Sequence, residues 1–222
     1  MKKIISTLLL TTTVLSGAGS VLATEYEDAY NARSNVNAEV IAGEDIVNPG
    51  PGPEEIETPG PENPDAEIYG IKYISNLDFG QGEFSTEDQI LSTQFDADLV
   101  GEKGGRLFSH VSIRDIRPQA EREGWNLTVQ RDTDFIPGSQ LTFAPAFNQN
   151  SLGFSESDLM IPSTVSVNAS PAMFMSTADA NNPAGISAMV NMGDAELTIP
   201  ANTGAGEYST TLTWNLVTGP AA

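Results

Sequence analysis

Few residues in this chain have side chains suited to catalysis. The sequence contains one histidine, His110, and no cysteine. A thiol protease and a zinc site built from several histidines are therefore excluded. A Ser-His-Asp triad would have to use His110, but no nucleophile-elbow pattern accompanies it. We expect His110 to be a structural or surface histidine.

Two pairs of acids have a spacing that suits carboxylate chemistry, Asp96 with Asp98 and Asp132 with Asp134. Paired carboxylates serve as the catalytic groups of glycosidases and as ligands in calcium loops. Neither pair extends into a full calcium loop, and D-x-D spacing is common in an acidic chain. We therefore expect solvated loop acids. The sequence predicts a protein that is not an enzyme and that uses no cofactor or metal ion.

The charge balance restricts the classes of partner. The chain has 30 acidic and 10 basic residues, which gives a formal net charge of -20 at pH 7. Nucleic-acid binding depends on the neutralisation of phosphates by Lys and Arg, so no nucleic-acid partner is expected. The same excess of acids disfavours docking on anionic lipids and attraction to phosphate-rich wall polymers.

The two tryptophans of the chain occur in the same tripeptide, W-N-L. The first copy lies in "GWNLTVQ" (124–130) and the second in "LTWNLVTGPAA" (212–222). Because alternate side chains of an extended strand point to opposite faces, each tryptophan shares a face with apolar neighbours. The shared faces hold Trp125, Leu127 and Val129 in the first copy, and Tyr208, Leu212, Trp214 and Leu216 in the second.

Two roles are open for these motifs. In the first, the tryptophans and leucines are core anchors that hold two strands in place, as their alternation with other apolar residues favours. In the second, the indole rings are exposed and stack on sugar rings or on a partner protein, and neighbouring polar residues supply hydrogen bonds. The candidate ligand- or partner-binding residues are Trp125, Leu127, Trp214, Leu216, Asn126, Asn215 and Tyr208.

The elements that would position these motifs are short strands. Between residues 68 and 222, alternation recurs in short runs bounded by Gly, Pro, Asn or Asp, as in "SHVSIRD" (109–115) and "GISAMVNMG" (185–193). No stretch has a convincing long helical period. We predict an all-β fold, in which residues 68–222 form a single β-sandwich or barrel-like domain of short, mostly antiparallel strands.

Residues 24–67 have a different composition. The stretch "NPGPGPEEIETPGPENPD" (48–65) is rich in proline, glycine and glutamate. Such a segment buries too little apolar surface to offset the entropy of ordering it. Residues 24–46, which precede this stretch, have no strong apolar stripe. The sequence therefore predicts a disordered, acidic, Pro/Gly-rich tether over residues 24–67.

The first 23 residues have the pattern of a signal peptide. Lys2 and Lys3 precede an apolar run, and Val21 and Ala23 fit the small-residue cleavage rule. The run is shorter than the roughly 20 residues that a spanning helix needs, and no later segment approaches that length. The chain also has no cysteine for lipidation and no L-P-x-T-G signal followed by an apolar tail. We expect a secreted protein that is held at a surface non-covalently, without direct membrane insertion.

The two ordered W-x-L copies, with the second in "GEYSTTLTWNLVTGP" (206–220), resemble the WxL-domain surface proteins of Gram-positive bacteria. The "SNLDFG" at 75–80 and the "VSIRDIRPQAEREGW" at 111–125 also resemble that family, and the resemblance covers roughly residues 68–222. It implies non-covalent attachment to the cell wall through peptidoglycan. It also implies a possible membrane-anchored surface protein as partner.

The sequence and the resemblance together predict a cell-surface binding module. The first alternative is a subunit of a surface complex that a membrane-anchored partner holds, without direct glycan binding. The second is a wall hydrolase that uses paired carboxylates. This chain lacks the large additional adhesive regions of longer WxL proteins, so a separate adhesive function is not expected.

Overall fold

The structure is a computed structural model, and it describes residues 24–41, 53–54, 62–100, 105–133, 135–179, 181 and 183–219. The signal peptide predicted over residues 1–23 lies outside the described residues, as does most of the Pro-rich stretch. The regular secondary structure of the described residues is β-strand apart from two short 3₁₀ helices, η1 (Gln119–Glu121) and η2 (Glu156–Asp158). The predicted all-β fold is confirmed.

Three hydrogen-bonded sheets make up the fold. The largest follows the order β13 (Leu159–Met160), β15 (Ala172–Thr177), β10 (Trp125–Arg131), β18 (Gly206–Thr218), β2 (Asn31–Ile41), β5 (Leu77–Glu83), β7 (Phe95–Val100), β8 (Arg106–Phe108) and β3 (Pro53–Glu54), with β1 (Glu25–Tyr26) paired to β2. The second is β14 (Val165–Val167), β11 (Gln140–Phe143), β17 (Ala195–Ile199) and β6 (Gln89–Thr93). The third is β12 (Ala146–Phe147), β16 (Ile186–Asn191), β9 (His110–Asp115) and β4 (Tyr69–Ile74).

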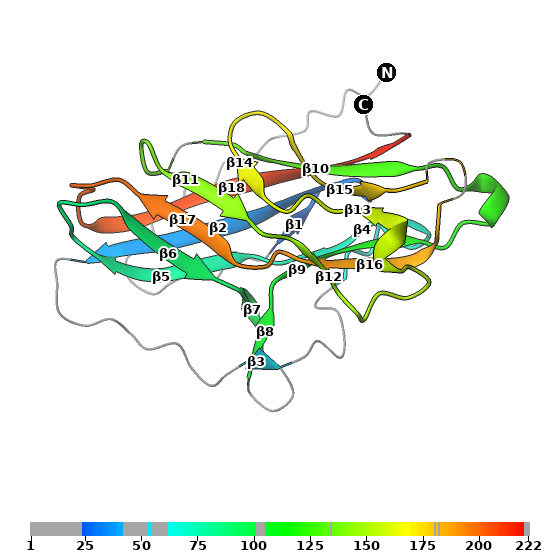
Figure 1. Cartoon of the computed structure of the whole chain (residues 1–222), viewed down its shortest axis with the longest axis horizontal. Helices are drawn as coiled ribbons and strands as arrows, with labels where there is room; N and C mark the ends of the chain where they lie inside the picture. Colours follow the sequence, from blue (N-terminus) through cyan, green and yellow to red (C-terminus); the bar gives the residue numbers. More distant parts are fainter. Residues whose placement is uncertain are drawn as a thin grey trace, which may run out of the picture.

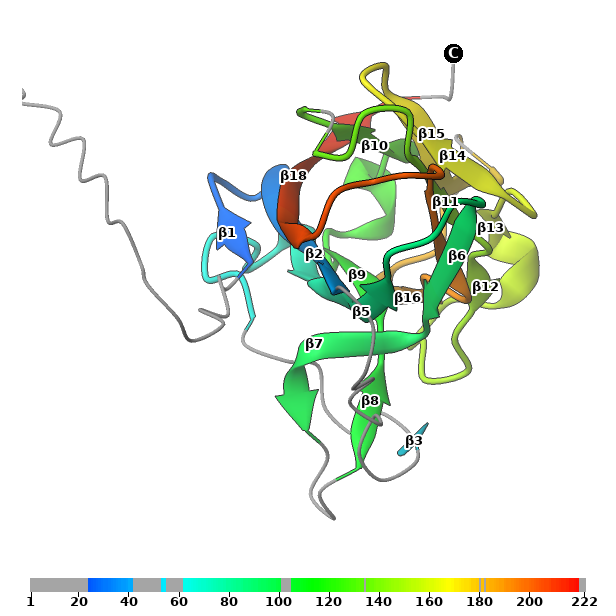
Figure 2. The same ribbon diagram turned by 90° about the vertical axis from the view of Figure 1, so that its left-hand side faces the viewer.

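These sheets enclose one elongated interior. Figure 1 shows β10, β18 and β2 running along the length of the molecule, and the end-on view of Figure 2 shows β2, β5, β6, β11 and β18 arranged around a common centre. Most strand pairs are antiparallel, whereas β2 pairs with β5, and β3 with β8, in parallel. The arrangement agrees with the predicted barrel-like domain of short, mostly antiparallel strands.

A single hydrophobic core joins the sheets. It takes Trp214 and Val36 from the largest sheet, Leu197 from the second and Ile113 and Val190 from the third, all at most 2% exposed. Alternation in the strands produces this core, since β10 has the burial pattern of a strand with one face inward and one outward. Burial of apolar surface contributes about 25 cal/mol per Å², and it is the main force that holds the sheets together.

The segment that contains residues 24–41 belongs to this fold, which corrects the tether predicted over residues 24–67. Strand β2 lies between β18 and β5 in the largest sheet, and it pairs with β18 from Asn31 to Val40. Residues 62–67 are also placed against the body, where Asn63 is fully buried. Residues 42–52 and 55–61, the rest of the predicted tether, lie outside the described residues.

The tether prediction failed for β2 because the strand has small inward side chains. Its inward positions include Ala32, Ser34 and Ala38, which are buried but carry little apolar surface. Their alternation with outward asparagines is a strand pattern of period two, but the small inward side chains form no strong apolar stripe. The strand gains stability from hydrogen bonds to neighbours on both sides, and a local sequence pattern does not report these.

A β-ribbon formed by β7 and β8 projects from the body, as both views show. Phe95 and Phe108 stack across it with ring centroids 5.7 Å apart, and the Arg106 guanidinium lies 4.2 Å from the centroid of Phe95. Leu107 on this ribbon packs with Met189 of β16 in a small second cluster. Ring contacts within the ribbon and the packing of Leu107 on β16 therefore hold the ribbon in place.

Candidate functional site

The two W-N-L segments lie side by side in neighbouring strands. Strands β10 and β18 are antiparallel, with Leu127 opposite Leu216 and Val129 opposite Trp214. Trp125, Trp214 and Leu127 are 0% exposed, and Leu216 is 4% exposed. The structure thus places all four apolar residues of the motifs in the core. In this conformation they are strand anchors, and none of them presents a ring or a methyl group to a ligand.

Trp214 connects the last strand to the first long strand of the chain. Its indole Nε1 donates a hydrogen bond of 2.9 Å to Oγ of Ser34 on β2, and both residues are buried. Its ring also contacts Phe174 edge-on at 5.1 Å and stacks near Phe143 at 6.3 Å. The second motif therefore holds β18, β2 and the facing sheet to one another.

Trp125 occupies a different environment in the same core. Its ring meets Phe154 edge-on at 6.4 Å, and its backbone N–H donates to Oγ1 of Thr177 on β15 at 3.0 Å. Its buried indole Nε1 has no hydrogen-bond partner among the described residues. The two tryptophans have equal burial, but only that of Trp214 has a hydrogen-bonded indole.

The central residues of the motifs point outward. Asn126 and Asn215 are partly exposed, and Nδ2 of Asn215 donates a hydrogen bond of 2.6 Å to Oδ1 of Asn31 on β2. Thr128 lies beside Asn215 and donates to its backbone carbonyl at 3.4 Å. The outer surface of β10, β18 and β2 therefore carries amides and hydroxyls, groups that both donate and accept hydrogen bonds, beside the exposed Val217 and Arg33.

Tyr208 lies away from these residues, near the start of β18 and opposite Ala38 of β2. It is partly buried against the core, and its hydroxyl donates a hydrogen bond of 2.7 Å to the carbonyl of Gly204. The shared face predicted for Tyr208, Leu212, Trp214 and Leu216 is present in β18. The structure does not bring Tyr208 together with the asparagines of the motifs.

A groove of about 510 Å³ opens at the other end of β18. Its lining comes from the turn before β2, the segment that leads into β4, and the residues just after β9. The lining residues are Ala29, Tyr30, Pro64, Asp65, Glu67, Ile68, Tyr69 and Arg117. The strand that carries the second motif supports this groove. The backbone N–H of Leu216 donates a hydrogen bond of 2.8 Å to the Tyr30 carbonyl, and the Thr218 hydroxyl lies 3.3 Å from the Tyr69 hydroxyl. Sequence reasoning missed these lining residues, because they lie in three separate segments and part of them was assigned to the tether.

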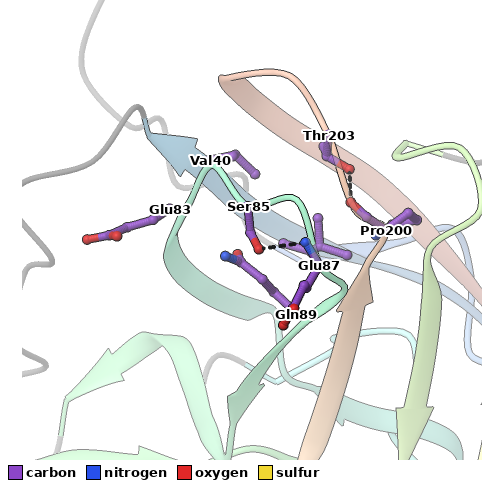
Figure 3. A pocket seen from close by; sticks show the side chains of 8 residues that line it. Val40, Glu83, Ser85, Glu87, Gln89, Pro200 and Thr203 are labelled. Carbon is purple, nitrogen blue, oxygen red and sulfur yellow. Dashed lines mark hydrogen bonds between the residues drawn. The ribbon is translucent and has the colours of Figure 1, made fainter.

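A second hollow at the far end of the sheets, shown in Figure 3, is too tight for a water molecule. Its residues bond among themselves, with the Glu87 N–H donating to Ser85 Oγ and the Thr203 hydroxyl donating to the Pro200 carbonyl. This hollow therefore has no room for a ligand.

The residues considered for catalysis lie apart from the groove. His110 is 0% exposed and stacks on Tyr73 at 4.7 Å. Burial lowers its pKa to about 4, so the ring is neutral at pH 7. Asp96 accepts a hydrogen bond from the Tyr73 hydroxyl and is 3% exposed, so the prediction of a solvated loop acid is wrong for this residue. Burial also raises the pKa of Asp98, its neighbour.

The second acid pair is only partly described, since Asp134 lies outside the described residues and Asp132 accepts a hydrogen bond from Thr213. Across the described ranges, no group of three His, Cys, Asp or Glu side chains is arranged to hold a metal ion. In the same part of the chain, no helix has the length and apolar character needed to cross a membrane.

Comparison with known families places the chain. The sequence pattern of the family described as "WxL domain surface cell wall-binding" matches residues 27–220. The match begins far upstream of residue 68, the start of the predicted β domain, and so includes the segment that forms β2. No curated protein and no solved structure matches the chain. Because the match spans nearly the whole chain, the protein belongs to the WxL family of surface cell wall-binding domains.

Proposed function

We propose that this protein is a secreted, non-enzymatic module that attaches to the bacterial cell wall by direct, non-covalent binding to peptidoglycan. The family match carries the wall attachment, since it covers the strands that build both the outer face and the groove. The peptidoglycan ligand is supported by charge, because a chain of net charge -20 is repelled by the phosphates of anionic wall polymers.

The outer face of β10, β18 and β2 also supports a glycan ligand. Its groups include the partly exposed amides and hydroxyls of residues such as Asn126 and Thr128, which are suited to pair with the hydroxyl and acetamido groups of wall sugars. The buried tryptophans hold in place the two strands that carry this face. In this proposal the motif supports the binding surface from below and does not touch the ligand.

Sedimentation with purified wall tests the proposal. Residues 24–222 are incubated with peptidoglycan that has been stripped of its anionic polymers, with no other protein present. Direct binding predicts that the protein pellets with the stripped wall. If the protein stays in the supernatant until a membrane-anchored surface protein is added, the direct-binding proposal is contradicted and the surface-complex alternative is supported. A fall in wall turbidity would contradict the non-enzymatic role.

A further inference from the structure

The groove at the end of β18 combines an exposed aromatic ring with polar groups. Tyr30 is 42% exposed and lies beside Tyr69, with ring centroids 5.4 Å apart and planes tilted by 56°. Ile68 is 57% exposed and lines the same space. At about 510 Å³, the groove is within the usual size range of sites for small ligands, and it mixes apolar surface with a few polar groups as such sites do.

The wall of the groove formed by Tyr30 is fixed by a polar turn. Oδ1 of Asp28 accepts hydrogen bonds from the backbone N–H groups of Tyr30 and Asn31, at 2.7 and 2.8 Å. These bonds lower the pKa of Asp28, the bond from Tyr30 most of all, so the carboxylate is ionised at neutral pH. The Tyr30 backbone is therefore held before any ligand arrives.

The opposite wall is tied to the same turn. Asn63 is buried, and its Nδ2 donates to the carbonyls of Asp28 and Ile71 at 2.9 and 3.0 Å. Gly70 has φ of +153°, and a Cβ built there would lie 2.2 Å from the carbonyl oxygen of Ala29. Only glycine allows this close approach. The groove is thus a preformed feature of the fold, and its shape does not depend on a ligand.

The charges of the groove disfavour an anionic ligand. The Arg117 guanidinium is already engaged, since it donates to both carboxylate oxygens of buried Asp115 at 2.9 and 2.8 Å and lies 3.9 Å from the centroid of Tyr69. Asp65 and Glu67 are exposed at the rim and add negative charge. A phosphate or a carboxylate would meet repulsion here, whereas carboxylates readily accept hydrogen bonds from hydroxyl groups.

We propose that this groove binds a neutral, N-acetylated sugar residue of the wall glycan, whose apolar ring face packs on Tyr30 and whose hydroxyl groups donate to Asp65 and Glu67. This inference rests on the proposed wall-binding function, and it adds to the outer face of β10, β18 and β2 a separate groove that holds one sugar ring. It also gives the second W-N-L segment a role at a distance, because Leu216 and Thr218 support the ring pair from behind.

A set of aromatic variants tests the groove. The probe is the tetrasaccharide of N-acetylglucosamine, titrated into residues 24–222 by isothermal titration calorimetry. Tyr30→Phe keeps the ring and retains binding. Tyr30→Ala removes the stacking surface and weakens binding by about tenfold or more. The matched control is Phe84→Ala, which removes an aromatic ring that is 50% exposed outside the groove, and this variant binds like the wild type.

The same variants in the wall sedimentation assay separate this inference from the proposed function. If the wild type and Tyr30→Ala pellet equally well, while thermal melts show that both are folded, the proposed sugar binding by the groove is overturned. The proposed wall binding then still stands. If Phe84→Ala loses binding as much as Tyr30→Ala, the effect is not specific to the groove and the inference is also overturned. If the wild type itself does not pellet with wall alone, the proposed function fails first.

Discussion

Replacement of each tryptophan by phenylalanine tests the asymmetry between the two motifs. Both indoles are 0% exposed and both substitutions remove the same atoms from the core. Only Trp214 loses a hydrogen bond, because its Nε1 donates to Ser34 whereas that of Trp125 has no described partner. Trp214→Phe is therefore expected to be the more destabilising change.

The size of the difference follows from the hydrogen bond. Trp214→Phe leaves the Ser34 hydroxyl buried at 1% exposure without the indole donor. A buried polar group that loses its partner costs about 1–3 kcal/mol. We expect the free energy of unfolding to fall by about 1–2 kcal/mol more for Trp214→Phe than for Trp125→Phe. In a domain of this size, that difference lowers the melting temperature by about a further 3–6 °C.

Urea denaturation of residues 24–222 and its two variants measures this difference. Ser34→Ala provides the partner mutation for a double-mutant cycle with Trp214→Phe, and a coupling energy of about 1 kcal/mol is expected. Equal losses for the two tryptophan variants, together with no coupling to Ser34, would refute the assignment of the indole hydrogen bond and the place of β2 beside β18.

Three further predictions concern the fold and its pH dependence. A chain of residues 62–222, which lacks β2, is expected to remain unfolded by circular dichroism, because β18 and β5 both lose their central neighbour; a native-like spectrum would contradict the integration of β2. Burial lowers the pKa of His110 from 6.5 to about 4, so the unfolded chain binds a proton in the window between these values that the folded chain does not. The stability that His110 contributes is thus complete above pH 6.5 and is lost as pH falls, by about 2 kcal/mol between pH 7 and pH 5. Urea midpoints measured across that range in the wild type and in His110→Gln test this, and equal pH slopes for the two would contradict it. Gly70→Ala places a Cβ against the carbonyl of Ala29 and is expected to lower the melting temperature, whereas Gly80→Ala, at positive φ but in open space, is expected to cost less; the reverse order in thermal melts would be inconsistent with the close approach at Ala29.

The strands that the sequence predicted are those in which apolar and polar residues alternate strongly. The runs around Val111 and Ile113, and around Val190, form β9 and β16, and the shared face of Trp214 and Leu216 is buried. Period-two burial needs only local information, since each strand has large apolar groups on one side. The same information does not determine which strands are neighbours. The pairing of β10 with β18, which brings the two motifs together, is visible only in the structure.

The groove illustrates the limit of sequence reasoning for a site. Tyr30, Tyr69 and Arg117 come from three segments, and no spacing rule relates them. Two further residues determine the shape of the groove without lining it. Asp28 acts by holding the turn, and Gly70 acts by allowing two backbones to approach. The tryptophans are large and rare, so the sequence offers them as candidate binding residues. In the structure they are buried, and they support a surface that other residues form.

The central claim is that the W-N-L residues act from the core and that the ligand meets the exterior. Sedimentation of the Trp125→Phe variant with stripped peptidoglycan, at a temperature well below its melting transition, tests this claim most directly. The account predicts that the folded variant pellets to the same extent as the wild type, because Trp125 is 0% exposed. A folded variant that no longer pellets, beside a wild type that does, would show that the indole itself contacts the wall and would contradict the account.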